Sequence, residues 1–340
     1  MCTNIKLSAK NGDIFFGRTM DLDISMFGED SGLDLDITLA TVPKNINIAS
    51  QVSPWTSKYT VLGVMTKYTT VMYDGINEHG LTGDMQVLVE ATTKNTQDIL
   101  NENKKPLLTE EFVLYILSNF KTVSEIKEHY QEFVLADEPF VYKKQNLHFP
   151  LHYTFVDTTG KGIVLEPVLN GGFKIYDYVD VMTNSPEYSY HTTNIRHYIN
   201  LSDIDHPTHR VMKNNVDIEP IEHGTGYGLF GMPGDYTSPS RFIRSFYLRN
   251  MIDEFDSNDG LNRLYSIFRP LIVPRGLEHK KAEMTITDYT RYWSGYDVAK
   301  QTAYVQTGEG LAITAKTLDS NLTDITYHAI HLDNNVVFAS

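Results

Sequence analysis

Cysteine is nearly absent from this chain of 340 residues, because Cys2 is the only one. A single cysteine permits no disulfide within the chain, which is typical of a protein in a reducing cytoplasm. No apolar run reaches the roughly 20 residues that a membrane-spanning helix needs. Lys6 and Lys10 interrupt the apolar stretch that a signal peptide would require near the N-terminus. We therefore expect a cytoplasmic protein with no membrane segment.

Basic residues are scarce relative to acidic ones. The chain has 29 Lys and Arg against 43 Asp and Glu, which gives a net charge of −14 at pH 7. Because a nucleic-acid-binding surface needs clustered positive charge, we expect no nucleic-acid partner. The hydrophobic share of 41% and the charged share of 21% are those of a soluble globular protein.

Apolar alternation and turn signals predict an α+β fold, since strands come in consecutive runs and helices in pairs. No Pro/Gly/Ser linker divides the chain, so we expect one domain over 1–340. The expected strands beyond the first 21 residues are 59–65, 81–89, 152–157, 162–167, 172–177, 284–293, 302–307 and 323–332. The expected helices are 109–120, which begins on a Thr109 cap, 122–133, which begins with a Thr122 capping box, 238–251 and 262–269.

The first 21 residues predict a β-hairpin around Asn11-Gly12, which favours a two-residue type I′ loop. That loop would place Cys2 opposite Asp21 at the end of the ladder, and Arg18 on the same face as apolar side chains such as Ile5 and Leu7. Because a buried arginine is usually paired, Arg18 needs a partner. In a regular strand Arg18 and Asp21 point to opposite faces, so both can serve Cys2 only if a β-bulge or strand end interrupts residues 19–21.

Cys2 could be a chance cysteine on an exposed terminal strand, but its position also suits catalysis. Removal of Met1 would leave Cys2 with a thiol nucleophile and a free α-amine, whose ordinary pKa is about 7.7–8.0. Such an amine can take the thiol proton without a histidine. Arg18 would increase the thiolate fraction, and Asp21 would orient the amine.

Several short stretches, spread over most of the chain, form a characteristic set by their order and spacing. They are MCTNI at 1–5, FFGRTMD at 15–21, YDGINEHGL at 73–81, PLHYTFVD at 150–157 with GIVLEP at 162–167, VMTNSPEYSYHTTNIRHY at 181–198, and GLFGMPGDYTSPSRFIR at 228–244. Together they resemble the cysteine N-terminal nucleophile (Ntn) hydrolases of the choloylglycine hydrolase type, which include bile salt hydrolases and penicillin V acylases. The resemblance implies a four-layer αββα sandwich, a homotetramer, and hydrolysis of non-peptide amide C–N bonds. We expect neither a cofactor nor a metal.

The resemblance also implies a set of catalytic residues. Cys2 would be the nucleophile with its own α-amine as the base, and Arg18 and Asp21 would polarise and orient it. The side-chain amide of Asn184 would donate to the oxyanion, and Arg241 would supply a supporting charge. Without the resemblance, Asn184 would be interpreted as a turn residue before Ser-Pro and Arg241 as an exposed helix residue.

One position departs from the family pattern. Ten residues after Asn77 the family usually has Asn in bile salt hydrolases or Tyr in penicillin V acylases, and this chain has Val87. A backbone N–H at Val87 can still be the second oxyanion donor, a contact whose loss can cost about 2.7–4 kcal/mol. The side chain at this position therefore gives no clue to the substrate.

The expected substrate is a small amide with an apolar acyl group. PLHYTFVD and VMTNSPEY look closer to the penicillin V acylase branch, so we expect an aryloxyacetyl or similar amide such as phenoxymethylpenicillin. Glycine- or taurine-conjugated bile salts are the close alternative, and N-acyl homoserine lactones are the third. A different class is a non-catalytic lipid- or bile-acid-binding protein on the same scaffold, which would tolerate loss of Cys2.

Overall fold

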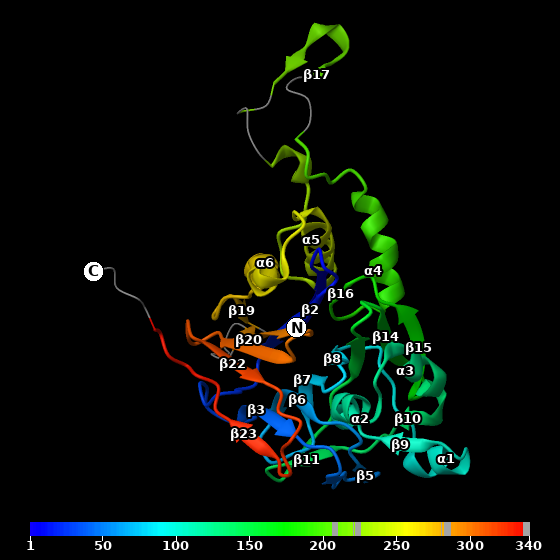
Figure 1. Cartoon of the computed structure of the whole chain (residues 1–340). Coiled ribbons are helices and arrows are strands. Elements are labelled where there is room, and N and C mark those ends of the chain that lie inside the picture. The colour runs from blue at the N-terminus through cyan, green and yellow to red at the C-terminus, as the bar shows by residue number, and fades with distance from the viewer. Residues whose placement is uncertain (206–209, 220, 222–225, 280, 282–286, 336–340) are drawn as a thin grey trace.

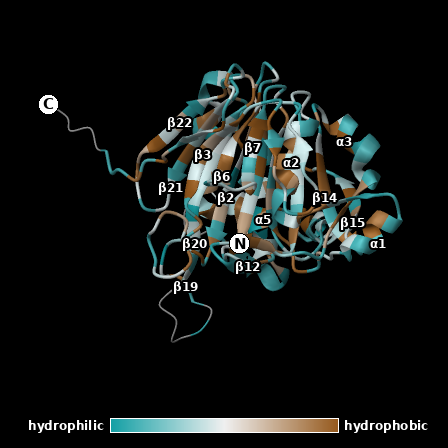
Figure 2. Cartoon of the chain, turned by 90° about the horizontal axis from the view of Figure 1, so that it is seen from below, coloured by the Kyte–Doolittle hydropathy of each residue, from teal (hydrophilic) through white to brown (hydrophobic). Residues whose placement is uncertain are grey.

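The computed structural model describes residues 1–205, 210–219, 221, 226–279, 281 and 287–335. Over these residues two large antiparallel sheets lie face to face with helices outside them, as Figure 1 shows. Apolar residues run along the strands and polar residues gather on the outer helices and loops (Figure 2). This layering confirms the predicted α+β class and the αββα sandwich.

The first sheet contains the N-terminal hairpin. Its order is β16 (Val181–Met182), β1 (Cys2–Ser8), β2 (Ile14–Leu22), β20 (Thr287–Asp297), β21 (Thr302–Thr307) and β22 (Ile313–Thr317), with β19 (Glu278–His279) beside β20. Helices α5 (Ser238–Met251) and α6 (Gly260–Phe268) contact this sheet. Leu264 of α6 packs with Ile5, Leu7 and Phe15 in an apolar cluster, which fixes the outer face of the hairpin.

The second sheet faces the inner side of the first. Its order is β15 (Gly172–Asp177), β14 (Gly162–Leu169), β13 (Leu151–Val156), β8 (Thr82–Val87), β7 (Met72–Asn77), β6 (Val61–Thr66), β3 (Ile37–Val42) and β23 (Thr326–His328). Helix α2 (Phe112–Asn119) contacts β6, β7 and β8 and forms the opposite outer layer.

Shorter elements surround these layers. The helices are α1 (Thr96–Asn101), α3 (Val123–His129) and α4 (Tyr188–Asn194), and the paired short strands are β4 (Asn47–Ile48) with β5 (Trp55–Thr56), β9 (Lys105–Leu107) with β10 (Phe133–Leu135), β11 (Phe140–Tyr142) with β12 (Gln145–Leu147), and β17 (Arg210–Val211) with β18 (Asp217–Ile218). The described residues contain no helix that is both long enough and apolar enough to cross a membrane.

Most expected elements are found, with changes at their ends. The helix predicted at 238–251 and the strand predicted at 302–307 have these bounds. The strand predicted at 284–293 is β20 from residue 287 onward, and its first three residues lie outside the described part. The strand predicted at 323–332 shrinks to the three residues of β23.

The two predicted helix starts differ in outcome. Thr122 caps α3 as expected, because its side chain accepts a hydrogen bond from the Glu125 N–H. Thr109 is instead the first residue of a 3₁₀ turn, η1 (Thr109–Glu111), and α2 begins only at Phe112. The expectation of a Thr109 cap was therefore wrong.

The N-terminal hairpin forms as predicted, but its register differs by one residue. Cys2 lies opposite Met20, not opposite Asp21. Gly12 has a φ of 90°, and the Ala9 N–H donates to the Asp13 carbonyl at 2.9 Å, so the turn is a three-residue loop with a left-handed glycine.

This shift changes which side chains share a face, because a slip of one residue moves every side chain on one strand to the other side. Cys2, Phe16 and Met20 belong to the core between the two sheets. Ile5 and Leu7 instead belong to the cluster under the helices. Arg18 therefore shares the inner face with Cys2, and the expectation that it would lie among Ile5 and Leu7 was wrong.

The predicted irregularity near residues 19–21 is confirmed. Between β2 and β20, Met20 lies opposite Tyr292 whereas Asp21 lies opposite Thr290, so the register shifts between them. The extra residue is Arg291 on β20, and a bulge of this kind bends the strand locally. The shift in register therefore falls at the end of β2 that adjoins Cys2.

Candidate active site

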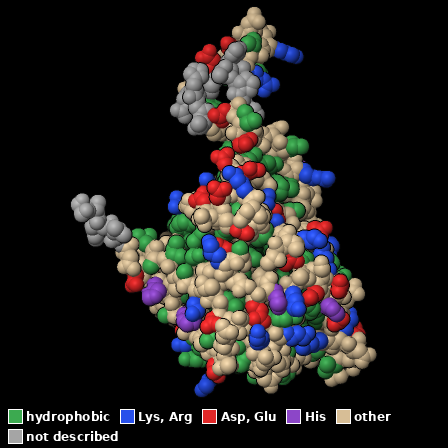
Figure 3. All heavy atoms as spheres, in the orientation of Figure 1, with side chains coloured by type: hydrophobic (Ala, Val, Ile, Leu, Met, Phe, Trp, Pro, Cys, Tyr) green, Lys and Arg blue, Asp and Glu red, His purple; other side chains and the backbone are tan. Residues whose placement is uncertain are grey.

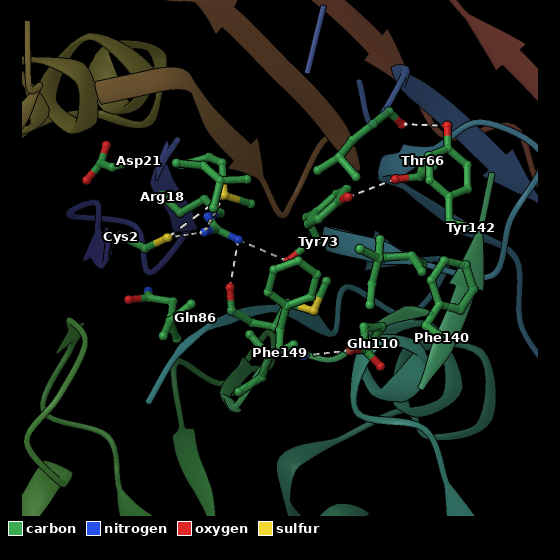
Figure 4. A pocket seen from close by; sticks show the side chains of 18 residues that line it. Cys2, Arg18, Asp21, Thr66, Tyr73, Gln86, Glu110, Phe140, Tyr142 and Phe149 are labelled. Carbon is green, nitrogen blue, oxygen red and sulfur yellow. Dashed lines mark hydrogen bonds between the residues drawn. The ribbon is translucent and has the colours of Figure 1, made fainter. Parts of the chain in front are cut away.

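A pocket opens between the two sheets at the start of β1. Cys2 and Arg18 lie at one end and Glu110 lies in another part, as Figure 4 shows. Its empty volume of about 610 Å³ includes space that is open to solvent. Most lining side chains are apolar or aromatic: Met20, Leu22, Leu35, Val71, Tyr73, Met85, Val87, Phe140, Tyr142, Leu147, Phe149 and Leu151.

The Cys2 thiol and the Arg18 guanidinium are in direct contact. Arg18 Nη2 lies 2.8 Å from Cys2 Sγ, and both residues are buried. Arg18 Nη1 also donates to the Met85 carbonyl at 2.8 Å and to the Tyr73 carbonyl at 3.2 Å. These backbone contacts with the facing sheet fix the guanidinium, so a positive charge is held beside the sulfur.

Arg18 finds the partners that its burial demands. Its guanidinium lies 4.0 Å from Asp74 Oδ2 on β7 and 3.9 Å from Asp84 Oδ2 on β8, and all three side chains are fully buried. Burial opposes the charge of Arg18, but Cys2, Tyr292 and these two carboxylates outweigh it and raise its pKa. Burial raises the pKa of Asp84 to about 6, although Arg18 and two hydrogen bonds oppose that shift.

The sequence prediction omitted Asp74 and Asp84. Tyr292 and Tyr296 donate to Asp74 at 2.6 and 2.5 Å, and Asn4 donates to Asp84 at 2.7 Å. The sequence feature that could have identified them is the one used for Arg18, namely a charged residue inside an apolar strand. Asp84 in the strand predicted at 81–89 met that criterion.

Asp21 lies at the Cys2 end of the pocket (Figure 4). Its backbone N–H donates to the Met1 carbonyl at 2.7 Å, and its carboxylate accepts from Thr290 at 2.5 Å. Burial raises its pKa, while the N-terminal amine and Arg241 act in the opposite direction. Asp21 therefore holds the residue that precedes Cys2.

Asn184 follows β16 and touches the backbone of Cys2. Its Oδ1 accepts from the Cys2 N–H at 2.6 Å, and its Nδ2 donates to the Val87 carbonyl at 2.9 Å. The Asn184 carbonyl in turn interacts with His191 Nε2 at 2.8 Å and accepts from the Ser238 hydroxyl at 2.8 Å. The interpretation of Asn184 as a simple turn residue is therefore wrong, since its side chain joins β1 to β8.

Arg241 is fully buried on α5, not exposed. Its Nη2 donates to Asn184 Oδ1 at 2.9 Å, and its Nη1 donates to the Cys2 carbonyl and to the Thr3 hydroxyl. Burial lowers the pKa of Arg241, while Asp21 and Cys2 oppose that shift. One guanidinium thus fixes both Asn184 and the backbone of Cys2.

The backbone of Val87 faces the same place. Leu88 N–H donates to the Pro150 carbonyl at 2.9 Å, so residue 88 belongs to a hydrogen-bonded position of the β8–β13 ladder. Antiparallel ladders alternate, so the N–H and C=O of Val87 point away from β13. On that side the Val87 C=O accepts a hydrogen bond from Asn184 Nδ2, and the Val87 N–H belongs to the same edge of β8.

The arrangement brings together the six residues that the sequence suggested. Cys2, Arg18, Asp21 and Val87 line the pocket, and Asn184 and Arg241 bond directly to Cys2. With Met1 in place, the Cys2 nitrogen is a peptide nitrogen and cannot act as a base. Among the described residues, no group of three or more His, Cys, Asp or Glu side chains could hold a metal ion.

Comparison with known proteins gives concordant matches. The model of the linear amide C–N hydrolases, choloylglycine hydrolase family, matches residues 2–331. A bile salt hydrolase/transferase from Clostridium perfringens is 30% identical over 320 residues, which cover 93% of this chain and 92% of that protein. The crystal structure of the C2A mutant of conjugated bile acid hydrolase from the same species has a TM-score of 0.85 at 26% identity, with 100% of each chain covered.

A more distant match is a protein named for a different activity. The structure of penicillin V acylase from Agrobacterium tumefaciens has a TM-score of 0.68 at 19% identity, covering 92% of this chain and 84% of that one. At this identity the similarity shows a shared fold and nothing finer.

Proposed function

We propose that this chain, which belongs to the choloylglycine hydrolase family of linear amide C–N hydrolases, cleaves the amide of conjugated bile salts. The observation that carries the proposal is the Cys2 thiol, held 2.8 Å from Arg18 at the end of an apolar pocket. Such a pocket suits a large apolar acyl group, and relatives across most of the chain bear bile salt hydrolase names.

This proposal replaces our first expectation, a penicillin V acylase. The bile salt hydrolase from C. perfringens is 30% identical to this chain, whereas the penicillin V acylase structure is 19% identical and supports the fold alone. Phenoxymethylpenicillin and N-acyl homoserine lactones are the less favoured substrates. The chain acts on linear amide C–N bonds under each of these alternatives.

In the proposed cycle, removal of Met1 turns the Cys2 nitrogen into a free amine. The amine takes the thiol proton while the sulfur attacks the amide carbonyl, and the carbonyl oxygen becomes an oxyanion. The C–N bond then breaks, the proton goes to the leaving glycine or taurine nitrogen, and a thioester to Cys2 is left. Water, deprotonated by the same amine, hydrolyses the thioester and releases the free acid.

The proposed roles of the other residues follow from their contacts. Arg18 stabilises the thiolate, and the second N–H of Asn184 Nδ2 together with the Val87 N–H donates to the oxyanion. Arg241 positions Asn184 through its bond to Oδ1. Asp21, whose N–H bonds the Met1 carbonyl, becomes available to orient the amine once Met1 has left.

We also propose that the chain assembles with copies of itself as a homotetramer. The supporting observation is the segment around β17 and β18, which extends away from the sheets and carries hydrophobic side chains among charged ones (Figures 1 and 3). Its exposed apolar residues include Ile204, Val211, Met212, Val216, Ile218 and Phe230. Association would cover this apolar surface.

The enzyme proposal is tested with purified protein on glycocholate, taurocholate and phenoxymethylpenicillin, with release of free amine measured by mass spectrometry. We expect turnover of the bile salts by the native protein and a loss of at least about 10⁴-fold in Cys2→Ala. The Cys2→Ala variant should retain its melting temperature, which excludes unfolding as the cause. Equal turnover by both proteins would instead support a binding protein, and intact mass that retains Met1 on active protein would exclude the amine as base.

A further inference from the structure

Glu110 places a buried carboxyl group in the wall of the apolar pocket. It lies in the 3₁₀ turn before α2 and is only 2% exposed. Its Oε1 accepts from the Phe149 N–H at 2.9 Å, whereas its Oε2 has no hydrogen-bond partner among the described residues. Buried polar atoms are nearly always paired, so an unpaired oxygen beside a pocket needs an explanation.

The next residue shows that the same turn can pair a buried carboxylate completely. Glu111 accepts from the Thr70 hydroxyl through Oε1 and from the Ser50 hydroxyl through Oε2, both at 2.6 Å. Glu111 does not line the pocket, and Glu110 does. The unpaired oxygen is therefore confined to the carboxyl that faces the ligand space.

No described basic side chain forms an ion pair with Glu110. Burial and the nearby Glu111 raise the pKa of Glu110 to about 7, while the Phe149 N–H lowers it. At neutral pH the carboxyl can thus be protonated or ionised. In either form Oε2 can hydrogen-bond a hydroxyl group, which is both a donor and an acceptor.

Glu110 lies in a different part of the pocket from Cys2 (Figure 4). Because most side chains that line the pocket are apolar, it suits the acyl group of a substrate better than glycine or taurine, and the acyl group would then be the part that reaches Glu110. Phe140 and Phe149 lie near Glu110 (Figure 4), and their side chains offer no strong hydrogen bond to an acyl chain.

We infer that Glu110 is a specificity-determining residue whose free Oε2 binds a hydroxyl group on the acyl part of the substrate, remote from the amide that is cleaved. For the steroid substrates this inference rests on the proposed function, because bile acids differ from one another in their ring hydroxyl groups. The same contact would favour any hydroxylated acyl group over its deoxy analogue.

The test compares kcat/KM for two matched substrate pairs. One pair is the glycine conjugate of a ring-hydroxylated cholanic acid and that of unsubstituted cholanic acid. The other pair is 12-hydroxydodecanoyl-glycine and dodecanoyl-glycine. We expect the native enzyme to prefer the hydroxylated member of at least one pair by roughly 5- to 150-fold, the range for a buried hydrogen bond.

Variants connect that preference to Glu110. Glu110→Met should reduce the preference to about onefold, because the side chain keeps its length but loses both oxygens. Glu110→Gln should keep most of it, because an amide still hydrogen-bonds a hydroxyl. Glu111→Gln is the matched control and should keep the native ratio, since its carboxylate does not line the pocket.

Equal kcat/KM within both pairs for the native enzyme would overturn the inference, even if Glu110→Met fails to fold. An unchanged ratio in a folded Glu110→Met variant would also overturn it. If only the linear pair is hydrolysed and shows the preference, the inference stands while the bile salt proposal fails. If the steroid pair is hydrolysed and neither pair shows a preference, the bile salt proposal stands and the inference fails.

Discussion

Two hairpins of this chain differ in what covers them. In β1–β2 nearly every side chain is buried, on one face against the second sheet and on the other against α5 and α6. In β17–β18 all four strand residues are exposed, and Val211 and Ile218 remain 58% and 53% exposed. Apolar residues in a short hairpin therefore do not by themselves indicate whether other parts of the same chain bury them.

The two hairpins also differ in the environment of their arginine side chains. Arg18 in β2 is fully buried between Cys2, Asp74 and Asp84, whereas Arg210 in β17 is exposed. A charge removed from water must be matched by nearby opposite charge, and one in water need not be. Substitutions at equivalent residue types in the two hairpins should therefore have very different effects.

The largest expected effect on stability is that of Arg18→Met. It would leave two buried carboxylates without their cation, so the free energy of unfolding should fall by about 3–5 kcal/mol. Activity should fall as well, because the sulfur loses its neighbouring charge. Chemical denaturation measures the first effect, and Arg210→Met in the exposed hairpin should change stability by less than about 0.5 kcal/mol. Equal effects of the two substitutions would remove the distinction between the hairpins.

The next effect concerns catalysis more than stability. Asn184→Ala removes a proposed oxyanion donor, so kcat should fall by about 10²–10³-fold with a smaller change in KM. Steady-state kinetics on glycocholate measures both constants. Asn200, exposed in the segment that leads to β17, supplies the control substitution Asn200→Ala, for which we expect native kinetics. A purely structural role for Asn184 would be indicated by a loss of melting temperature that matches the loss of activity.

The sequence was sufficient for the hairpin but not for its register. Asn11-Gly12 favours a tight turn, yet a glycine with positive φ serves a three-residue loop as well as a two-residue one. Strand β2 has apolar residues on both faces, Phe15 on one and Phe16 on the other, so hydrophobic alternation in that strand could not choose between the registers. Packing against a sheet on one side and helices on the other decides it, and that information is not local.

The site shows the same division between local and distant information. Cys2, Arg18 and Asp21 lie in one hairpin and could be proposed together from their chemistry. Asn184 and Arg241 needed the family resemblance, because nothing local distinguishes them from a turn residue and a surface residue. Asp74 and Asp84 were missed, since only the face-to-face packing of the two sheets brings them close to Arg18.

A smaller effect is expected from the pH dependence of stability. The Glu110 carboxyl has a pKa of about 7 in the folded protein against 4.5 ordinarily, so folding strengthens its hold on the proton. Its contribution to stability is fully present below pH 4.5 and is lost as the pH rises through 7. Relative to Glu110→Gln, the native protein should therefore lose roughly 1–3 kcal/mol between pH 4.5 and 7.5.

Urea denaturation of both proteins at the two pH values measures this difference. Asp235, near the exposed segment, is the control because hydrogen bonds from Thr237 lower its pKa to about 2. Asp235→Asn should thus leave the change in the free energy of unfolding between pH 4.5 and 7.5 as it is in the native protein. Parallel pH profiles for the native protein and Glu110→Gln would contradict the raised pKa of Glu110.

The smallest effect on the isolated chain is expected in the exposed hairpin. Val211→Ser with Ile218→Ser removes two apolar side chains that are more than half exposed, so each should change the free energy of unfolding by less than about 0.5 kcal/mol. If these residues pack against another copy of the chain, the same double variant should lower the mass of the particle measured by light scattering. It should also make the melting temperature depend less strongly on protein concentration, because a dissociated chain unfolds without mass action. If the native protein and the double variant have the same particle mass, the exposed apolar residues of β17–β18 do not hold the assembly together. The contrast between the hairpins would then be one of burial alone.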